Sequence, residues 1–143
     1  MIGAILLKRG MGRGYEAIGR HDLDAVMAGW AEDGVFEYPG HSTMSGRIVG
    51  RASIRRWFAR WFDTMPDIRF TVKHVAVENL FALGLTNTVI VEWELDETRH
   101  DGASFHATGA SAFHVRRGKV TSFRDYIFNQ EIIDEVWGVE AAT

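Results

Sequence analysis

The chain has 143 residues, an ordinary size for one domain, and its 46% hydrophobic and 24% charged residues are typical of a folded globular protein. A net charge of −3 gives no electrostatic case for nucleic-acid binding, and the absence of cysteine excludes disulfides, thiolate nucleophiles and cysteine-bound metals. We therefore expect a single domain over residues 1–143 with no nucleic-acid partner.

The first residues are apolar, but the run 2–7 is far shorter than the roughly 20 residues of a membrane span. Its positive charges, Lys8 and Arg9, follow the apolar run, whereas a signal peptide places them before it. We therefore expect no membrane association and a cytoplasmic location. Met11 is an alternative start, and residues 1–13 are then a disordered extension of the domain.

Helical patterns follow this segment. A short amphipathic piece begins at Gly14, and Asp22 is the expected N-cap of a second helix, which Glu32–Gly34 ends. The second helix has an apolar stripe with i, i+3, i+4 and i+7 spacing: Leu23, Val26, Met27 and Trp30. The N-terminal part of the chain is therefore predicted to form a helix pair.

A short strand, Val35–Tyr38, is expected next, and a polar loop covers residues 41–50. The strongest helix pattern spans Arg51–Met65, and its apolar stripe consists of Ile54, Trp57, Phe58, Trp61 and Phe62. The helix also carries four arginines off this stripe: Arg51, Arg55, Arg56 and Arg60. A basic helix can mark a phosphate or membrane surface, but in an acidic chain we favour a solvated face. Trp61→Ala should then cost several times as much stability as a surface change.

From Ile68 the pattern is mostly that of strands, followed by a short helix over Gln130–Gly138. Four strands are expected in a meander: 68–79, 86–97, 103–115 and 119–128. Helices followed by an antiparallel meander are typical of an α+β domain with its helices on one face of a curved sheet.

The last strand carries an unusual carboxylate. Alternation places Asp125 on the same face as Phe123 and Ile127, between two large apolar side chains. With Tyr38, the inward faces of neighbouring elements supply the lining of a small-molecule site. We expect that lining to include Trp30, Trp61, Asn87, Val91, Trp93, Ser111, Phe113 and Phe123, with His41 near the mouth. The alternatives are a solvated strand face, a packed core with satisfied polar groups, or an arginine such as Arg124 paired with Asp125.

A carboxyl in such a lining is desolvated, which raises its pKa toward neutrality. It can then take a proton next to a carbonyl group and return it elsewhere, while a hydroxyl donates a hydrogen bond to the enolate. The predicted catalytic residues are therefore Asp125, Tyr38 and Ser111. None of the six histidines forms a close metal-binding pair, so we expect no metal site and no cofactor.

The order of these motifs resembles a known family. A helix pair, the segment WAEDGVFEYPG, the stretch GRIVGRASIRRWFARWF and the final strand RRGKVTSFRDY resemble the SnoaL-like branch of the NTF2-like superfamily, over roughly residues 14–129. That superfamily includes polyketide cyclases, ketosteroid isomerases and limonene epoxide hydrolases. The resemblance implies a cone-shaped fold, in which a bent sheet wraps around helices and leaves a deep pocket, and a homodimer paired through the exposed sheet face.

The resemblance extends only in part to the functional residues. Ketosteroid isomerases place their proton-transferring Asp before the Pro of the first strand, where this chain has Tyr38. Their second acid and the His of SnoaL-type cyclases both fall near Ser111, while Asp125 corresponds to the acid–base Asp of those cyclases. The epoxide hydrolases need an Asp-Arg-Asp relay, for which we find no second inward Asp.

These observations predict a cofactor-free pocket with acid–base chemistry of the isomerase, cyclase or hydratase (lyase) type on a hydrophobic carbonyl or polycyclic compound. The alternative is a non-catalytic ligand-binding or accessory domain of the same fold. A perturbed pKa of Asp125 would favour the first hypothesis.

Overall fold

The computed structural model describes residues 2–82 and 85–138. The helices are α1 (Ile2–Gly19), α2 (Leu23–Ala28), α3 (Arg51–Thr64) and α4 (Glu131–Trp137). The strands are β1 (Trp30–Tyr38), β2 (Gly46–Val49), β3 (Asp67–Val77), β4 (Thr86–Thr98), β5 (Ser104–Arg116) and β6 (Lys119–Ile127). No helix within these described residues has both the length and the apolar character needed to cross a membrane.

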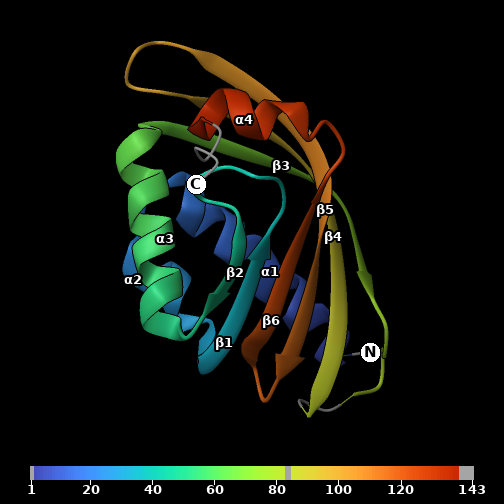
Figure 1. The fold of residues 1–143 in the computed structure, drawn as a ribbon. Helices are drawn as coiled ribbons and strands as arrows, with labels where there is room; N and C mark the ends of the chain where they lie inside the picture. Colours follow the sequence, from blue (N-terminus) through green and yellow to red (C-terminus); the bar gives the residue numbers. More distant parts are fainter. Residues whose placement is uncertain (1, 83–84, 139–143) are drawn as a thin grey trace.

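The six strands form one curved sheet in the order β2-β1-β6-β5-β4-β3 (Figure 1). Strands β3 to β6 make the predicted antiparallel meander, and β2 pairs antiparallel with β1. In contrast, β1 runs parallel to β6 and brings Phe36 beside Phe123. The structure confirms the predicted α+β class and curved sheet, but the sheet is not antiparallel throughout.

Two short segments differ from the local sequence pattern. Trp30, predicted to lie on a helical stripe, begins β1 instead, because α2 ends at Ala28 and the backbone of Trp30 pairs with Val120. Gly46–Val49, predicted to be part of a loop, forms β2 and adds an edge strand next to β1. In both segments, pairing across the sheet outweighs the preference of the isolated sequence.

Helix α3 confirms the predicted amphipathic helix. Its stripe is buried and consists of Ile54, Trp57, Phe58, Trp61 and Phe62. The ring of Trp57 packs at 4.7 Å from that of Phe36, which fixes α3 against β1. On the other side, Arg55 donates a hydrogen bond of 2.7 Å to Asp24, and Arg60 is exposed. The arginines therefore form a largely solvated face, as the sequence predicts.

Helix α1 begins at Ile2, well before the helical pattern recognised from Gly14. The helix packs along β3 and spans the open side of the sheet. Ala4, Tyr15 and Ala17 are buried, whereas Ile2, Ile5 and Leu6 near its start are exposed. Leu7 and Met11 are partly buried against the core. Residues that the sequence pattern left outside the folded core therefore contribute to the enclosed space described below.

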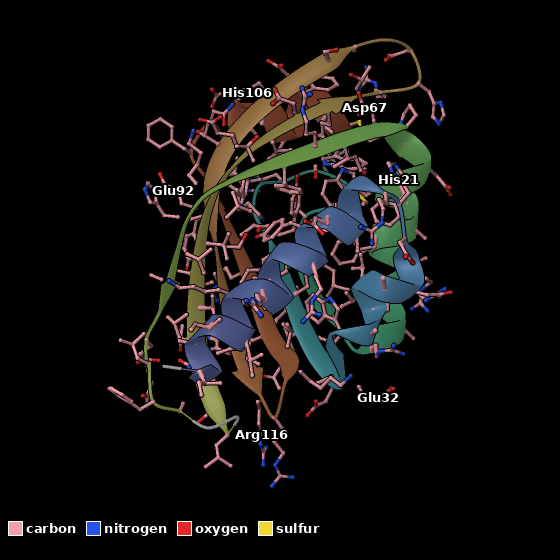
Figure 2. The ribbon with its side chains drawn as sticks, turned by 180° about the vertical axis from the view of Figure 1, so that it is seen from behind. His21, Glu32, Asp67, Glu92, His106 and Arg116 are labelled. Carbon is pink, nitrogen blue, oxygen red and sulfur yellow. The ribbon has the colours of Figure 1, made fainter. Side chains whose placement is uncertain are left out.

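The outer face of the sheet carries both ion pairs and apolar side chains. Figure 2 shows Glu92 and His106 on the side of the sheet away from α1. Between such charged positions, the small Ala110 and Ala112 stand beside Tyr126 and Ile90, which are 54% and 40% exposed. Exposed apolar side chains around small residues suit the approach of a second sheet.

We expect the protein to form a homodimer through this outer face, with about 1,200–2,000 Å² buried in total. Light scattering at micromolar concentration should give twice the chain mass. Ala110→Glu should give a monomer, because like charges would meet across a two-fold axis. A monomeric wild-type protein would contradict this interface.

Candidate functional site

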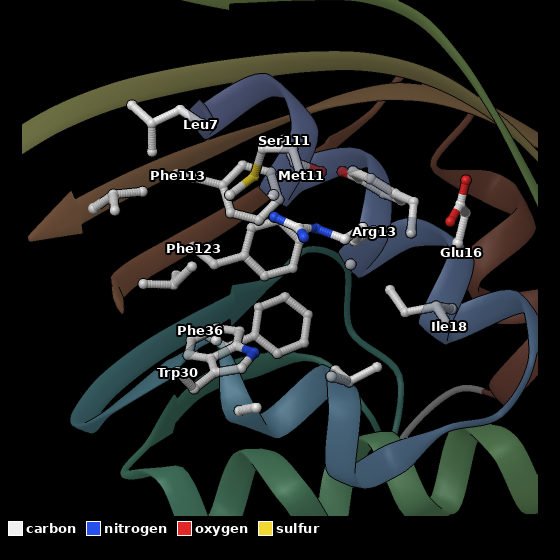
Figure 3. A pocket seen from close by; sticks show the side chains of 18 of the residues that line it. Leu7, Met11, Arg13, Glu16, Ile18, Trp30, Phe36, Ser111, Phe113 and Phe123 are labelled. Carbon is white, nitrogen blue, oxygen red and sulfur yellow. The ribbon is translucent and has the colours of Figure 1, made fainter. Parts of the chain in front are cut away.

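A cavity of about 1130 Å³ lies between α1 and the concave face of the sheet. Its floor is a stack of three rings, in which Phe123 lies 4.8 Å from Phe36 and 4.5 Å from Phe113. These rings come from the neighbouring strands β1, β6 and β5, whose register places them side by side. Figure 3 shows the stack facing the side chains of α1, including Leu7 and Met11. The cavity therefore has the size and apolar character of a small-molecule site.

Asp125 lines this cavity from β6, an interior strand of the sheet. The hydroxyl of Ser111, which is opposite on β5, donates a hydrogen bond of 2.6 Å to Asp125 Oδ1. Ser111 Oγ in turn accepts a hydrogen bond of 2.8 Å from Trp93 Nε1. Because a hydroxyl has only one hydrogen, Ser111 is committed to the carboxylate and holds it in place. Ser111 therefore has no hydrogen left to donate to a ligand, in contrast to the role expected from the sequence.

Burial raises the pKa of Asp125 to about 7, and the hydrogen bond from Ser111 opposes this rise. A cationic partner would lower the pKa again, but none reaches this carboxylate among the described residues. Arg124, the alternative partner, points to the other face of the sheet and pairs with Glu37. Asp125 thus sits poised to gain or lose a proton near neutral pH.

Two tyrosines near Asp125 have hydroxyl hydrogens without a recorded acceptor in the described part of the chain. Tyr38 lies one position beyond the Glu37–Arg124 pair, and its hydroxyl accepts a hydrogen bond of 3.2 Å from Trp137 Nε1. The hydroxyl of Tyr15, on α1, is buried and lacks any hydrogen-bond partner there. Both tyrosines line the cavity, so both can donate to a bound molecule.

Burial raises the pKa of both tyrosines well above the usual range, and the charge of Asp125 adds to this effect. The nearby hydroxyl of Ser111 partly lowers the pKa of Tyr15. The two hydroxyls nevertheless do not form a hydrogen bond. Each phenol therefore remains a neutral donor at ordinary pH. Sequence reasoning missed Tyr15, although its polar tip on an apolar helical stripe was a usable signal.

Glu97 is a second buried carboxyl of the cavity that sequence reasoning missed. It follows Trp93 and Leu95 on the inward face of β4 and is only 8% exposed. Burial raises its pKa to about 7, opposed by a hydrogen bond of 2.8 Å from Trp61 Nε1. Side chains on one strand face recur every second residue, so extending the inward face from Trp93 through Leu95 would have identified Glu97.

The remaining predicted site residues divide into those that line the cavity and those that do not. Those that line the cavity with the three predicted catalytic residues are Trp30, Trp61, Asn87, Trp93, Phe113 and Phe123. Asn87, however, is tied to the backbone of Asn79 through both its amide nitrogen and its amide oxygen, so its role is structural.

Two predicted residues do not line the cavity. Val91 is completely buried in the core beneath the lining, and His41 is exposed in the loop after β1. His41 directly follows Gly40, whose φ of 88° marks a turn just after β1. Within the described residues, no cluster of three or more potential ligands could hold a metal ion.

We expect the stability of the protein to fall as the pH rises from 5 to 8. The native pKa values of Asp125 and Glu97, about 7, exceed their ordinary values of 3.8 and 4.5. The native state therefore binds more protons than the unfolded state in this range, and stability present at low pH is lost as the pH rises through 7. The slope is up to about 1.4 kcal/mol per pH unit for each group.

Urea titrations at pH 5 and pH 8 would measure this fall. The Asp125→Asn variant should show a smaller fall than the wild type, while Asp63→Asn, which changes an exposed carboxylate on α3, should match the wild type. An equal fall in the wild type and in Asp125→Asn would mean that Asp125 titrates normally.

Comparisons with known proteins agree with this architecture. The sequence pattern of the family described as SnoaL-like domain matches residues 12–123. No curated protein matches the chain.

Solved structures share the fold at low sequence identity. Bal32a, from a soil-derived mobile gene cassette, is 22% identical, with a TM-score of 0.77 over 91% of this chain and 95% of that one. TerC, co-crystallized with polyporic acid, is 17% identical, with a TM-score of 0.73 over 90% and 95%. A hypothetical protein with a ketosteroid isomerase-like fold from Catenulispora acidiphila, in complex with trimethylamine, is 19% identical, with a TM-score of 0.70 over 92% and 94%.

Proposed function

This chain belongs to the SnoaL-like domain family, and we propose that its cavity binds a hydrophobic carbonyl compound and moves a proton within it by acid–base catalysis without a cofactor. The observation that carries this proposal is the buried carboxyl of Asp125, held by Ser111 in the wall of an aromatic cavity. A pKa of about 7 suits a group that must both accept and return a proton at neutral pH.

The proposed reaction begins with the carboxylate of Asp125, which removes a proton from the carbon next to the carbonyl group. The electron pair of the broken C–H bond moves onto the carbonyl oxygen, which becomes an enolate. Tyr15 or Tyr38 donates a hydrogen bond to this oxygen, since each has a hydroxyl hydrogen to offer. If the substrate has a carbon–carbon double bond next to the deprotonated carbon, the enolate is a dienolate. Asp125 then returns the proton to the far carbon of that double bond, the double bond moves into conjugation with the carbonyl group, and the product is an isomer of the substrate.

The relatives support a small-molecule ligand. Structures of the same fold contain polyporic acid in TerC and trimethylamine in the protein from Catenulispora acidiphila. The apolar cavity of this chain is large enough for a polycyclic ligand.

Hydrogen exchange would test the proposed chemistry directly. The protein is incubated in D₂O with a trans-decalone and with a saturated tetracyclic ketone, after thermal shift has shown which of them binds. NMR should then show deuterium entering the carbons next to the carbonyl group faster than in buffer alone. A ketone that binds without faster exchange would contradict the catalytic proposal.

The second candidate function is non-catalytic binding of an apolar ligand. The observation in its favour is that Tyr38 stands where the ketosteroid isomerases that the chain resembles carry their proton-transferring Asp, so the chain lacks the acid of that reaction. Tight binding without hydrogen exchange is the result expected of such a binding domain.

A further inference from the structure

The cavity holds a second carboxyl, Glu97, to which the proposed reaction gives no role. Its side chain belongs to β4 and lines the cavity beside Leu95. Within the described residues, its side chain accepts a hydrogen bond of 2.8 Å from the indole of Trp61. Asp125 is held by a different residue, Ser111, so the two carboxyls are separate polar groups in a largely apolar cavity.

Glu97 has no cationic partner among residues 2–82 and 85–138. A buried carboxylate is costly unless it is paired or fully hydrogen-bonded. In the described part of the chain no salt bridge involves Glu97, and Arg99, two positions along, is engaged elsewhere. Arg99 pairs with Asp101 at 2.7 Å and donates to the backbone of Val136 at 3.1 Å. The carboxyl of Glu97 therefore retains capacity to accept a hydrogen bond from the cavity.

The position of Tyr38 relates the two carboxyls to each other. The charges of Asp125 and of Glu97 both act on its hydroxyl and raise its pKa, so this hydroxyl lies within electrostatic reach of both. The same part of the cavity is walled by Trp57 and Trp61, whose rings lie 5.6 Å apart. A molecule bound at Asp125 and Tyr38 can therefore continue along an aromatic wall toward Glu97.

We propose that Glu97 is a second polar contact for the ligand and accepts a hydrogen bond from a hydroxyl or ammonium group at the end remote from the carbonyl. This inference rests on the proposed function, because it assumes that the carbonyl end lies at Asp125. The substrate class becomes narrower as a result: an apolar polycyclic ketone that carries a donor group at its far end. A ketone without that group leaves Glu97 without its second partner and binds more weakly.

Matched ligands would test this. The probes are a trans-decalone and a saturated tetracyclic ketone, each compared with derivatives that carry a hydroxyl or an amino group at the carbon farthest from the carbonyl. The two ring systems differ in length, so they test two distances between the carbonyl end at Asp125 and the donor end at Glu97. Titration calorimetry should show that, for the ring system of matching length, the added donor lowers Kd by about tenfold to a hundredfold.

Variants of Glu97 assign the effect to this residue. In Glu97→Leu the gain from the added donor should disappear, while binding of the unsubstituted ketone persists. In Glu97→Gln the gain from the amino group should fall more than that from the hydroxyl, because an amide oxygen still accepts a hydrogen bond but carries no charge. Glu92→Gln, an exposed carboxylate on the outer face of β4, is the control and should keep the full gain.

The amino and hydroxyl derivatives also distinguish the two sources of the donor. A larger gain for the amino derivative identifies an ammonium group as the natural contact, and equal gains identify a neutral hydroxyl. An added donor that gives no gain in the wild type, or a gain that survives in Glu97→Leu, would overturn the inference. Because these measurements concern binding, they stand apart from hydrogen exchange: exchange with no gain at Glu97 would overturn this inference alone. Absence of binding by every probe would overturn both proposals.

Discussion

The Asp125→Asn variant should lose turnover of any ketone that the wild type converts, by about 10²–10⁴-fold in kcat. An amide of nearly the same size cannot take the proton from carbon, yet its oxygen can still accept the hydrogen bond from Ser111. We therefore expect Kd for the ketone to remain within a fewfold of the wild-type value. Single-turnover measurements with the variant and calorimetry with the same ligand would separate the two effects.

Tyr38→Phe and Tyr15→Phe test which tyrosine hydroxyl acts in the reaction. Each removes one hydroxyl that can donate to the enolate, so the more important one should lower kcat with a smaller effect on binding. Asp63→Asn, on the exposed side of α3, serves as the matched carboxylate control and should leave kcat unchanged. Equal turnover by wild type and Asp125→Asn would show that Asp125 is not the base.

Phe36→Ala should lower the free energy of unfolding by about 3–5 kcal/mol. The ring of Phe36 is 1% exposed and stands at the centre of the aromatic core, 4.7 Å from Trp57 and 4.8 Å from Phe123. Its removal leaves a hole where β1, β6 and α3 meet. Urea denaturation followed by far-UV circular dichroism would measure the loss.

Arg56→Ala provides the comparison on an exposed position of α3, where its only recorded side-chain partner in the described residues is Ser53. This substitution should change stability by no more than about 0.5 kcal/mol. Phe36→Leu should cost less than Phe36→Ala, because it keeps most of the buried apolar surface. Equal stabilities of Phe36→Ala and Arg56→Ala would mean that β1 does not pack as the structure shows.

The sequence predicted those parts of the fold whose periodicity is long and uniform. The five-residue stripe of α3 and the alternation along β4, β5 and β6 each repeat often enough to identify the element and its buried face. The short segments were harder to predict, because four residues such as Gly46–Val49 contain too little pattern. Their structure depends on a neighbouring strand that the local sequence does not reveal.

Sequence periodicity likewise predicted only part of the candidate site. Asp125 stood out because a single strand shows its apolar neighbours, and Ser111 followed from the meander register. The apolar stripe that carries Tyr15 is visible in the sequence, but its place in the cavity depends on how α1 crosses the sheet. The position of His41 follows a turn at Gly40, which periodicity does not reveal. The hydroxyl of Ser111 accepts a hydrogen bond from the indole of Trp93 and donates its own hydrogen to Asp125. Considering only the pair Ser111 and Asp125 in the sequence does not reveal this role of Trp93.

The parallel pairing of β1 with β6 has a kinetic consequence. Glu37 and Arg124, which face each other in this pair, are 87 residues apart in the chain. Contacts between such distant segments form slowly, because the entropy of a long loop must be lost before they contribute. Tyr38 and Asp125 therefore meet only after the last strand has docked. During refolding, the capacity to bind a ligand should return later than the helical signal of α3, and a ribosome-bound chain that ends before β6 should lack it entirely.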